Sequence, residues 1–531
     1  ALQKGNDVAL KTGLTWTLLL AALVTGAQLR RHSQTGDTRL NATTGFHPVR
    51  VVNENTKRLA SGPFLGNGTR NGWADQTSIV IWTRTTREPE MRADGRPFIK
   101  IDNQRARQLA RVTDETKLLK PQLPEGATLD EMLGACPGAP GEVRLSYFPT
   151  GKPSEVQYRD WIRTSANSDF TAQWKLEGLQ PGTEYTTVIE TRSVEGQNGV
   201  KIQGRFQTAP AQEAKEPLRF CITTCHDFIR RDDGMKGHKI YPSMEKLNPN
   251  FVVYAGDIEY YDKPDPWALT KTLMRFKWGR IFSLPNNRKF YNQTTSYFIK
   301  DDHDTLSNDS WPGRTYGSVT FAEGVQLFNE EQFPTRDPRF TSIRWGKDLE
   351  IWILEGRDYR SPNNMPDGPE KTILGAEQKA WLFESLKASS ATFKLICSPT
   401  PIVGPDRKNK SDNHANEVFA HEGQEIRSVI SKIPGVIVFC GDRHWQYASK
   451  DDDTGLWEFG CGPGSERHEL GWKPGDERPE HHFLRVKGGF LSGQLEYDGA
   501  FAPRLTIRHH KVEGQVVSEF PFDGSGTVNQ E

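Results

Sequence analysis

The stretch FVVYAGDIEY, residues 251–260, says most about how this chain folds. Its first half is a continuous apolar run, which is typical of a strand buried on both faces of a parallel sheet. Its second half turns at Gly256 and places Asp257 directly after the strand. Because α/β proteins carry their chemistry at the carboxyl ends of strands, this stretch predicts an α/β domain with an active site at that edge.

Three more motifs rich in acidic and metal-binding side chains occur nearby, namely CHD at 225–227, DDHD at 301–304 and GDRH at 441–444. The first follows the apolar run 220–222, and the last follows the apolar run 436–440. Carboxyl ends of neighbouring strands meet at one edge of a sheet, so we expect these side chains to converge. Together the four motifs predict a hydrolase that uses two metal ions.

The bridge between the two metals is assigned to Asp257. A carboxylate shared by two cations holds them about 3.5–4 Å apart, which clamps the attacking and leaving oxygens of an in-line displacement. A first site would combine Asp257 with Cys225, Tyr260 and His444. Thiolate and phenolate ligands favour a trivalent or soft metal such as iron.

A second site would combine Asp257 with Asp302 and Asp442. This all-oxygen set suits a hard ion such as Ca²⁺, Mg²⁺ or Mn²⁺ better than zinc. His303 is next to Asp302 and is predicted to protonate the leaving alkoxide. Asn308 is predicted to bond a phosphate oxygen, although a turn asparagine at the surface fits the sequence equally well.

Length and composition limit the possible functions. A chain of 531 residues is too long for one hydrophobic core, so two or three domains are expected. The 68 basic and 68 acidic side chains cancel, which argues against a nucleic-acid-binding surface. The six cysteines are scattered and do not form the dense set of a disulfide scaffold, so they leave the redox compartment open.

The N-terminal region has the layout of an export signal. An apolar run at 14–24 follows Lys11 and precedes the small residues of 25–27. We expect residues 1–27 to be a signal peptide and the protein to be periplasmic, cell-surface or extracellular. An uncleaved N-terminal anchor and a buried helix are the alternatives.

Residues 45–210 alternate short β-type runs with turns, which is typical of a β-sandwich. Tyr185, after the turn at 179–184, resembles a tyrosine corner, so an N-terminal fibronectin- or Ig-like β-sandwich is expected. The charged segment 88–134 breaks the strand rhythm and is predicted to be a partly helical insertion.

From residue 217 to 515 the pattern changes to strands alternating with helices, which predicts an α/β layered domain. The expected helices are 235–247, 375–386 and 422–432. Residues 210–217 are expected to be the linker, and residues 516–531 a C-terminal tail.

These motifs resemble those of the alkaline phosphatase D family of calcineurin-like metallophosphoesterases and, more distantly, the purple acid phosphatases. The matching fragments, in chain order, are 60–63, 79–84, 224–225, 256–260, 301–304, 358–360, 374–386 and 441–444. The resemblance implies a fibronectin-like domain followed by a four-layer αββα metallophosphoesterase domain. It also implies hydrolysis of phosphate mono- or diesters by a hydroxide that two metal ions activate.

The resemblance further implies Fe³⁺ held by Cys225, Asp257, Tyr260 and His444. Beside it the family places a divalent ion, for which we expect Ca²⁺ first and Mn²⁺, Mg²⁺ or Zn²⁺ as alternatives. The substrate would be a small phosphate ester, and a monomer is expected.

Some positions depart from the family's pattern. His226 and Asp227 follow the cysteine in place of the usual polar residue, and Asp227 is either a further ligand or a group that orients one. The family's Leu-Asp-x-Arg segment is LEGR at 354–357 here, and residues 412–421 match poorly. The substrate range and the shell of the second metal are therefore the parts that the resemblance fixes least.

Two other functions remain open from the sequence. One is a phospholipase D-like or nucleotide phosphodiesterase with the same metal chemistry. The other is a non-catalytic extracellular binding protein whose metals only brace the fold. A serine hydrolase is disfavoured because the chain has no Gly-x-Ser-x-Gly motif of the kind that forms a nucleophile elbow.

Overall fold

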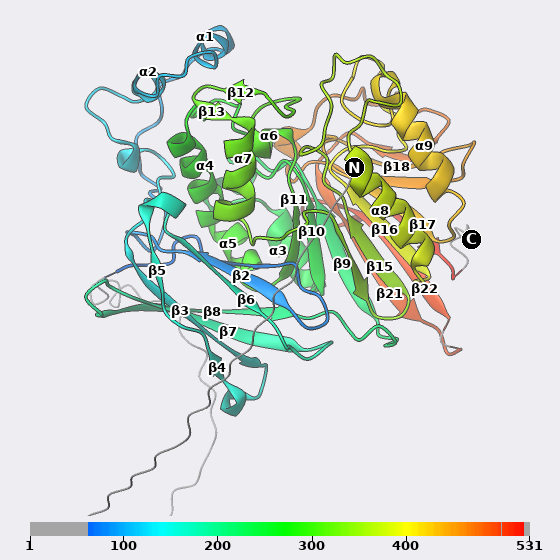
Figure 1. Ribbon diagram of the computed structural model, residues 1–531, viewed down its shortest axis with the longest axis horizontal. Helices are drawn as coiled ribbons and strands as arrows, with labels where there is room; N and C mark the ends of the chain where they lie inside the picture. The colour runs from blue at the N-terminus through cyan, green and yellow to red at the C-terminus, as the bar shows by residue number, and fades with distance from the viewer. Residues whose placement is uncertain (1–61, 501, 525–531) are drawn as a thin grey trace, which may run out of the picture. The chain divides into compact units, whose positions relative to one another are not determined.

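The computed structural model describes residues 62–500 and 502–524 (Figure 1). The expected signal peptide, residues 1–27, lies outside the described residues, as do the first residues of the expected sandwich. No helix within the described ranges has both the length and the apolar character needed to cross a bilayer.

Two large mixed sheets form the centre of the fold. The nine-stranded sheet has the order β23–β22–β21–β9–β10–β11–β1–β2–β6. Its strands are β1 (Thr69–Gly72), β2 (Ile79–Arg84), β6 (Thr171–Leu176), β9 (Leu218–Thr223), β10 (Phe251–Ala255), β11 (Thr295–Ile299), β21 (Gly489–Tyr497), β22 (Pro503–Lys511) and β23 (Val516–Phe522). The three strands β9, β10 and β11 are mutually parallel, so their carboxyl ends share one edge.

The seven-stranded sheet has the order β14–β15–β16–β17–β19–β18–β20. Its strands are β14 (Thr341–Trp345), β15 (Leu349–Ile353), β16 (Phe393–Ser398), β17 (Val436–Cys440), β18 (Gln446–Lys450), β19 (Trp457–Cys461) and β20 (His481–Arg485). The inner strands β15, β16 and β17 are parallel, and β17 is buried along its whole length. This explains why β17 appears as a continuous apolar run in the sequence, whereas β15 and β16 each include one charged residue.

The two sheets pack face to face, and helices cover their outer faces (Figure 1). Phe251 of the nine-stranded sheet packs on Trp345 of the seven-stranded sheet with ring centroids 4.5 Å apart. Tyr254, on the other face of β10, stacks on Tyr291 of α5 at 5.0 Å. The covering helices of the nine-stranded sheet are α3 (Ile240–Leu247), α4 (Lys271–Ser283) and α5 (Pro285–Tyr291), and those of the seven-stranded sheet are α8 (Gly375–Ala388) and α9 (Ala420–Ile430).

Of these helices, α3, α8 and α9 occupy the regions expected from the sequence, with shifted ends, whereas α4 and α5 were not expected. The expected helix at 235–247 begins only at Ile240, because Gly237 adopts a φ of 119° that interrupts the chain before it. The other helices are α1 (Asn103–Leu109), α2 (Thr116–Leu119), α6 (Asp302–Thr305) and α7 (Phe321–Gln326). Short helical turns are η1 (Lys120–Gln122), η2 (Leu129–Glu131), η3 (Pro153–Glu155), η4 (Ala166–Ser168), η5 (Gly234–Lys236), η6 (Leu327–Gln332), η7 (Glu417–Phe419) and η8 (Glu466–His468).

The N-terminal strands form two layers, but one layer belongs to the nine-stranded sheet. The other layer is a five-stranded sheet of β3 (Gly141–Pro149), β4 (Gln157–Tyr158), β5 (Ile162–Thr164), β7 (Glu184–Arg192) and β8 (Asn198–Gln207). Ile81, Trp174 and Leu145 share the core between the layers. The hydroxyl of Tyr185 accepts a hydrogen bond from the Gln180 N–H at 2.9 Å, which is the contact of a tyrosine corner.

Strand pairing crosses both of the expected domain limits. Strand β1 pairs in parallel with β11, so the N-terminal region joins the rest of the chain through a sheet and not only through the linker at 210–217. At the other end, β23 pairs with β22, so the region expected to be a tail from residue 516 begins with an edge strand. The expected insertion 88–134 contains α1 and α2. A separate small hairpin of β12 (Thr315–Tyr316) and β13 (Val319–Thr320) follows α6 in the sequence.

Candidate metal centre

The side chains proposed as ligands lie at the carboxyl ends of strands from both sheets. Cys225 follows β9, Asp257 follows β10, and Asp302 begins α6 just after β11. Asp442 and His444 follow β17 of the facing sheet. Residues from four distant parts of the sequence therefore converge at one edge of the two-sheet core.

Three of these ligand positions lie in sharp turns. The backbone φ angle is 52° at Cys225, 56° at Asp257 and 60° at Asp442, a left-handed region that side-chain-bearing residues seldom adopt. Such conformations persist only where surrounding contacts hold them, and they cluster at functional sites. One such contact is the hydrogen bond from the Cys225 N–H to the Gly256 carbonyl at 3.3 Å.

Two glycines allow these turns to approach one another. A Cβ atom on Gly441 would lie 2.0 Å from the Ala255 carbonyl oxygen, which no side chain tolerates. Gly256 has a φ of 90°, and a Cβ atom there would lie 2.7 Å from Cβ of Asp301. The glycine before each aspartate is thus required by the packing of the two strand ends.

Among the described residues, three sets of three side chains have ligand atoms within 4.8 Å of one another. The sets are Cys225, Asp257 and His444; Asp257, Asp302 and His303; and Asp257, Asp301 and Asp442. Asp257 belongs to all three. The structure therefore places the side chain assigned as the bridge at the centre of the cluster.

The four residues predicted for the first site lie together. The Tyr260 hydroxyl donates to Oδ2 of Asp257 at 2.9 Å and lies 3.2 Å from Nε2 of His444. Sγ of Cys225 lies 3.7 Å from the same Asp257 oxygen. These contacts place sulfur, phenol, imidazole and carboxylate donors around one point.

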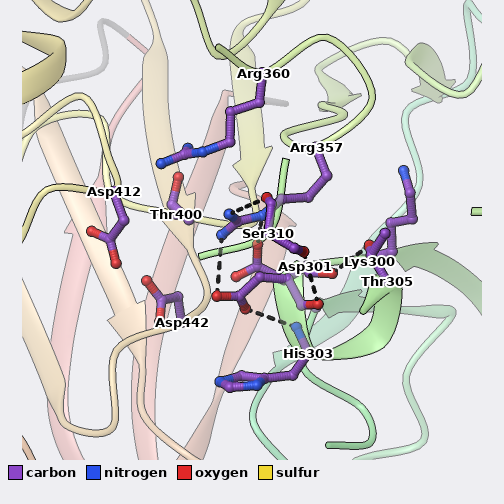
Figure 2. A network of polar contacts seen from close by, with 12 residues as sticks. Lys300, Asp301, His303, Thr305, Ser310, Arg357, Arg360, Thr400, Asp412 and Asp442 are labelled. Atoms are coloured by element: carbon purple, nitrogen blue, oxygen red, sulfur yellow. Dashed lines mark hydrogen bonds and ion pairs between the residues drawn. The ribbon is translucent and has the colours of Figure 1, made fainter. Parts of the chain in front are cut away.

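The second site differs from the set expected from the sequence. Asp302 and Asp442 both lie near Asp257, but in different sets. Asp301, to which the sequence assigned no ligand role, joins Asp442, whereas His303 joins Asp302. Figure 2 shows Asp301 between Asp442 and the loop that carries Arg357. The adjacent pair of aspartates at 301–302 is the sequence signal that points to this residue.

The charges of this cluster suit cations. Oδ1 of Asp257 and Oδ2 of Asp301 are buried and have no hydrogen-bond partner among the described residues. Burial, followed by the neighbouring carboxylates of Asp302 and Asp301, raises the pKa of Asp257 well above its usual range, although His303 opposes this. Burial and then Asp257 raise the pKa of the Cys225 thiol. A bound cation stabilises the deprotonated forms of such ligands, so the donor set fits a metal pair.

Two histidines of the centre have opposite pKa shifts. Burial and then the proximity of His468 lower the pKa of His444 well below the usual value, so its imidazole is neutral and able to bind a metal. Burial also disfavours a charge on His303, but Asp262 and Asp302 outweigh it and raise the pKa to about 10. Opposite shifts of this kind separate a ligand from a proton donor.

His303 is held by the carboxylate of Asp262, which lies outside the four motifs. Its Nδ1 lies 2.6 Å from Oδ1 of Asp262. The other oxygen of Asp262 accepts the backbone N–H of Asn308 at 2.9 Å. Asn308 is exposed and takes part through its backbone. Its predicted role toward phosphate stays a prediction.

Other residues of the four motifs orient the centre. Oδ1 of Asp304 accepts the N–H groups of Ile258 and Glu259 at 2.8 and 3.0 Å, which fixes the loop after Asp257. Asp227 accepts from Arg230 at 2.8 Å. It is an orienting group here, because its other oxygen accepts the Ile229 N–H at 3.0 Å.

His468, which lies outside the four motifs, is located beside the first site. Its ring centroid is 4.1 Å from that of His444 and 5.0 Å from that of Tyr260. Nδ1 of His468 lies 3.2 Å from the carbonyl oxygens of Cys225 and His226, to which it donates. By contrast, His414 pairs with Glu422 at 2.9 Å on the α9 side, so it has a structural contact there.

A buried arginine connects the two adjacent aspartates (Figure 2). Nε of Arg357 donates to Oδ1 of Asp301 at 2.5 Å, and Nη2 lies 3.9 Å from Oδ2 of Asp302. The Arg357 side chain is 1% exposed. Arg357 belongs to the LEGR segment that departs from the family's pattern, yet it holds the carboxylates at the second site.

A family model described as PhoD-like phosphatase matches residues 220–481, a range that includes every ligand proposed above. This region resembles the PhoD-like phosphatases. The resemblance expected from the sequence is thereby confirmed.

One curated relative agrees with this resemblance. Alkaline phosphatase D of Bacillus subtilis (strain 168) is 22% identical over 327 residues, which cover 52% of this chain and 53% of that protein. The chain thus matches about half the length of this curated relative.

Two solved structures share the fold. The structure of PhoD has a TM-score of 0.65 and 16% identity, covering 88% of this chain and 92% of that chain. Purple acid phosphatase PPD1 from yellow lupin (Lupinus luteus) seeds has a TM-score of 0.56 and 12% identity, covering 86% and 74%. The chain therefore shares the mixed-sheet fold of these two structures.

Proposed function

We propose that this protein is a phosphoric ester hydrolase that uses two metal ions. The observation that carries the proposal is the shared position of Asp257 in all three sets of ligand atoms. The family match and the purple acid phosphatase-like fold support the same metal-dependent chemistry. The proposed activity includes the hydrolysis of both phosphate monoesters and phosphate diesters.

Cys225, Asp257, Tyr260 and His444 would hold the metal of the first site. Asp257, with Asp302, Asp301 and Asp442, would hold the metal of the second site. Metal ions bound there would lower the pKa of a water molecule and offset negative charge on the phosphoryl oxygens. Iron at the first site and Ca²⁺ at the second fit the donor types.

The chain itself supplies proton transfer and positioning. His303 carries a proton at neutral pH, because its pKa is raised, and Asp262 fixes the ring through Nδ1. Nε2 is then free to donate to the leaving oxygen, so His303 is the proposed general acid. Arg357 holds the aspartates in place, and Asp304 fixes the loop of Asp257.

Replacing His303 with Ala is expected to slow alkyl phosphate hydrolysis by about 10²–10⁴-fold. Aryl phosphates with acidic leaving groups need less protonation and should lose much less. Steady-state rates on a matched aryl and alkyl pair would measure this. Asp262→Asn should show the same pattern at about tenfold, because it removes only the carboxylate that orients the ring. Equal losses on both substrates would count against an acid role.

Replacing Tyr260 with Phe tests the composition of the first site. A phenolate bound to Fe³⁺ absorbs visible light through charge transfer, so the purified protein should be violet. The Tyr260→Phe variant is expected to lose this band but to retain the second-site metal in elemental analysis. A variant that keeps the band would show that Tyr260 is not the chromophore's ligand.

The function itself is tested by reconstitution. Metal-free protein loaded with iron and Ca²⁺ should hydrolyse 4-nitrophenyl phosphate or bis(4-nitrophenyl) phosphate. Full metal occupancy without turnover on either ester would favour a binding protein with structural metals.

We also propose that the strands within 62–207 act as a sandwich module that shares its second layer with the catalytic region. Export of the protein is proposed from the apolar run at 14–24.

A further inference from the structure

Arg360 is a buried cation that the roles above leave unused. It is 2% exposed and lies in the loop after β15, three residues beyond Arg357. Its Nη2 donates to Oδ1 of Asn363 at 2.7 Å, and the guanidinium lies over the ring of Phe419 at 4.6 Å. Nε and Nη1 are buried and have no hydrogen-bond partner among the described residues.

Three carboxylates, those of Asp412, Asp309 and Asp301, act on the charge of Arg360, and each also pairs with another cation, Asp309 with Lys410 at 4.0 Å. Asp412 pairs with Lys410 at 2.6 Å and with Arg443 at 3.0 Å. Asp301 pairs with Arg357. Burial, followed by the charge of Arg357, lowers the pKa of Arg360 to about 10, so the guanidinium is still protonated at neutral pH. Burying a charged guanidinium with two nitrogens that have no hydrogen-bond partner costs free energy, unless an anion binds to those nitrogens.

The direction of the side chain indicates where that anion binds. In Figure 2, Arg360 points from its loop toward Thr400 and Asp412, on the side of the centre where Asp442 lies. Arg357, from the same loop, points to Asp301 and is already paired. The loop thus contributes one arginine to the carboxylates. It directs a second one, whose Nε and Nη1 have no hydrogen-bond partner among the described residues, toward the side of the centre where Asp412 and Asp442 lie.

We propose that Arg360 binds a charged non-bridging oxygen of the substrate's phosphoryl group and thereby favours phosphate monoesters over diesters. This inference rests on the proposed function. A monoester dianion presents charged oxygens, and one of them can accept a hydrogen bond from the unpartnered Nη1 of the guanidinium. In a diester a second ester group replaces one of these oxygens, so the guanidinium loses an acceptor. Inorganic phosphate, which has the same charged oxygens, should bind to Arg360 as well.

The test compares Arg360→Gln with wild-type protein loaded with iron and Ca²⁺. For Arg360→Gln we expect kcat/KM to fall about 100-fold on 4-nitrophenyl phosphate and only about threefold on bis(4-nitrophenyl) phosphate. The inhibition constant of inorganic phosphate should rise by a factor similar to the monoester loss. Arg360→Lys keeps the charge but not the planar fork, so it should recover part of the loss. If Arg360→Gln fails to fold, Arg360→Lys provides the same comparison.

Asn363→Ala is the matched control, because it removes the hydrogen-bond partner of Arg360 without removing the guanidinium. We expect near wild-type rates for this variant. An equal loss on both esters with unchanged phosphate inhibition would overturn the proposal. So would an Asn363→Ala variant that reproduces the loss, since Arg360 would then only anchor its loop.

Direct binding separates this proposal from the proposed function. Calorimetric titration of inorganic phosphate into the metal-loaded proteins should give weaker binding to Arg360→Gln than to wild type. If wild type hydrolyses neither ester but shows this difference, the proposed function fails and the anion-binding role of Arg360 stands. Absence of phosphate binding to wild type, or equal binding to both proteins, would overturn the role of Arg360.

Discussion

An Asp257→Asn variant is expected to lose at least about 10³-fold in kcat/KM on any phosphate ester. Asp257 is the residue common to all three sets of ligand atoms, so its loss weakens both metal sites together. Each bound metal lowers the activation free energy by several kcal/mol, so the loss of one metal lowers the rate by several powers of ten. Metal analysis of the dialysed variant should show less than one bound cation where wild type holds two.

Stability measurements sharpen this prediction. The variant removes one carboxylate from a buried acidic cluster, so the metal-free protein should be no less stable than metal-free wild type. Wild type should gain stability when metals are added, because a ligand that binds only the folded state stabilises it, and the variant should not. The control is Asp232→Asn, which should behave as wild type. Asp232 is a partly buried aspartate outside the centre, and its carboxylate accepts the Lys239 N–H. Retention of both metals by Asp257→Asn would contradict the assigned bridge.

Replacing Arg357 with Gln is expected to lower the free energy of unfolding of the metal-free protein by about 3–5 kcal/mol. The guanidinium is buried with Asp301, and removal of one partner leaves the other charge uncompensated. Bound metals would offset part of that charge, so the loss should be smaller in the metal-loaded protein. Denaturant unfolding of both forms measures the difference.

A double-mutant cycle gives the control for Arg357. Asp301→Asn in the Arg357→Gln background removes the orphaned charge, so it should restore part of the lost stability. If Arg357→Gln lowers the free energy of unfolding by less than about 1 kcal/mol, solvent or another group already screens the charge of Asp301. Solvent-exposed ion pairs contribute amounts of this size.

Local sequence patterns were sufficient to predict the strands that form the site. The runs at 220–222, 251–254 and 436–440 are buried in parallel sheets, and such strands appear as continuous apolar segments. The turn after each strand then positions Cys225, Asp257 and Asp442 through backbone geometry alone. Convergence of these strand ends follows from the general architecture of α/β sheets, which is why the motif residues could be grouped before their distances were known.

Contacts between distant residues were not predictable in the same way. Asp262 holds His303 across 41 positions, and Arg357 holds Asp301 across 56. Neither pair has a periodic or motif signal, because its geometry depends on how loops from two sheets meet. The parallel pairing of β1 with β11 has the same origin, and it joins regions that composition separates at 210–217.

The most direct test of the account is a crystal structure of the metal-loaded protein with anomalous diffraction data. We expect two anomalous peaks about 3.5–4 Å apart, both within bonding distance of the Asp257 carboxylate, with Cys225 and His444 at one peak and Asp442 at the other. Peaks located away from Asp257, or a single cation that Asp257 does not touch, would contradict it.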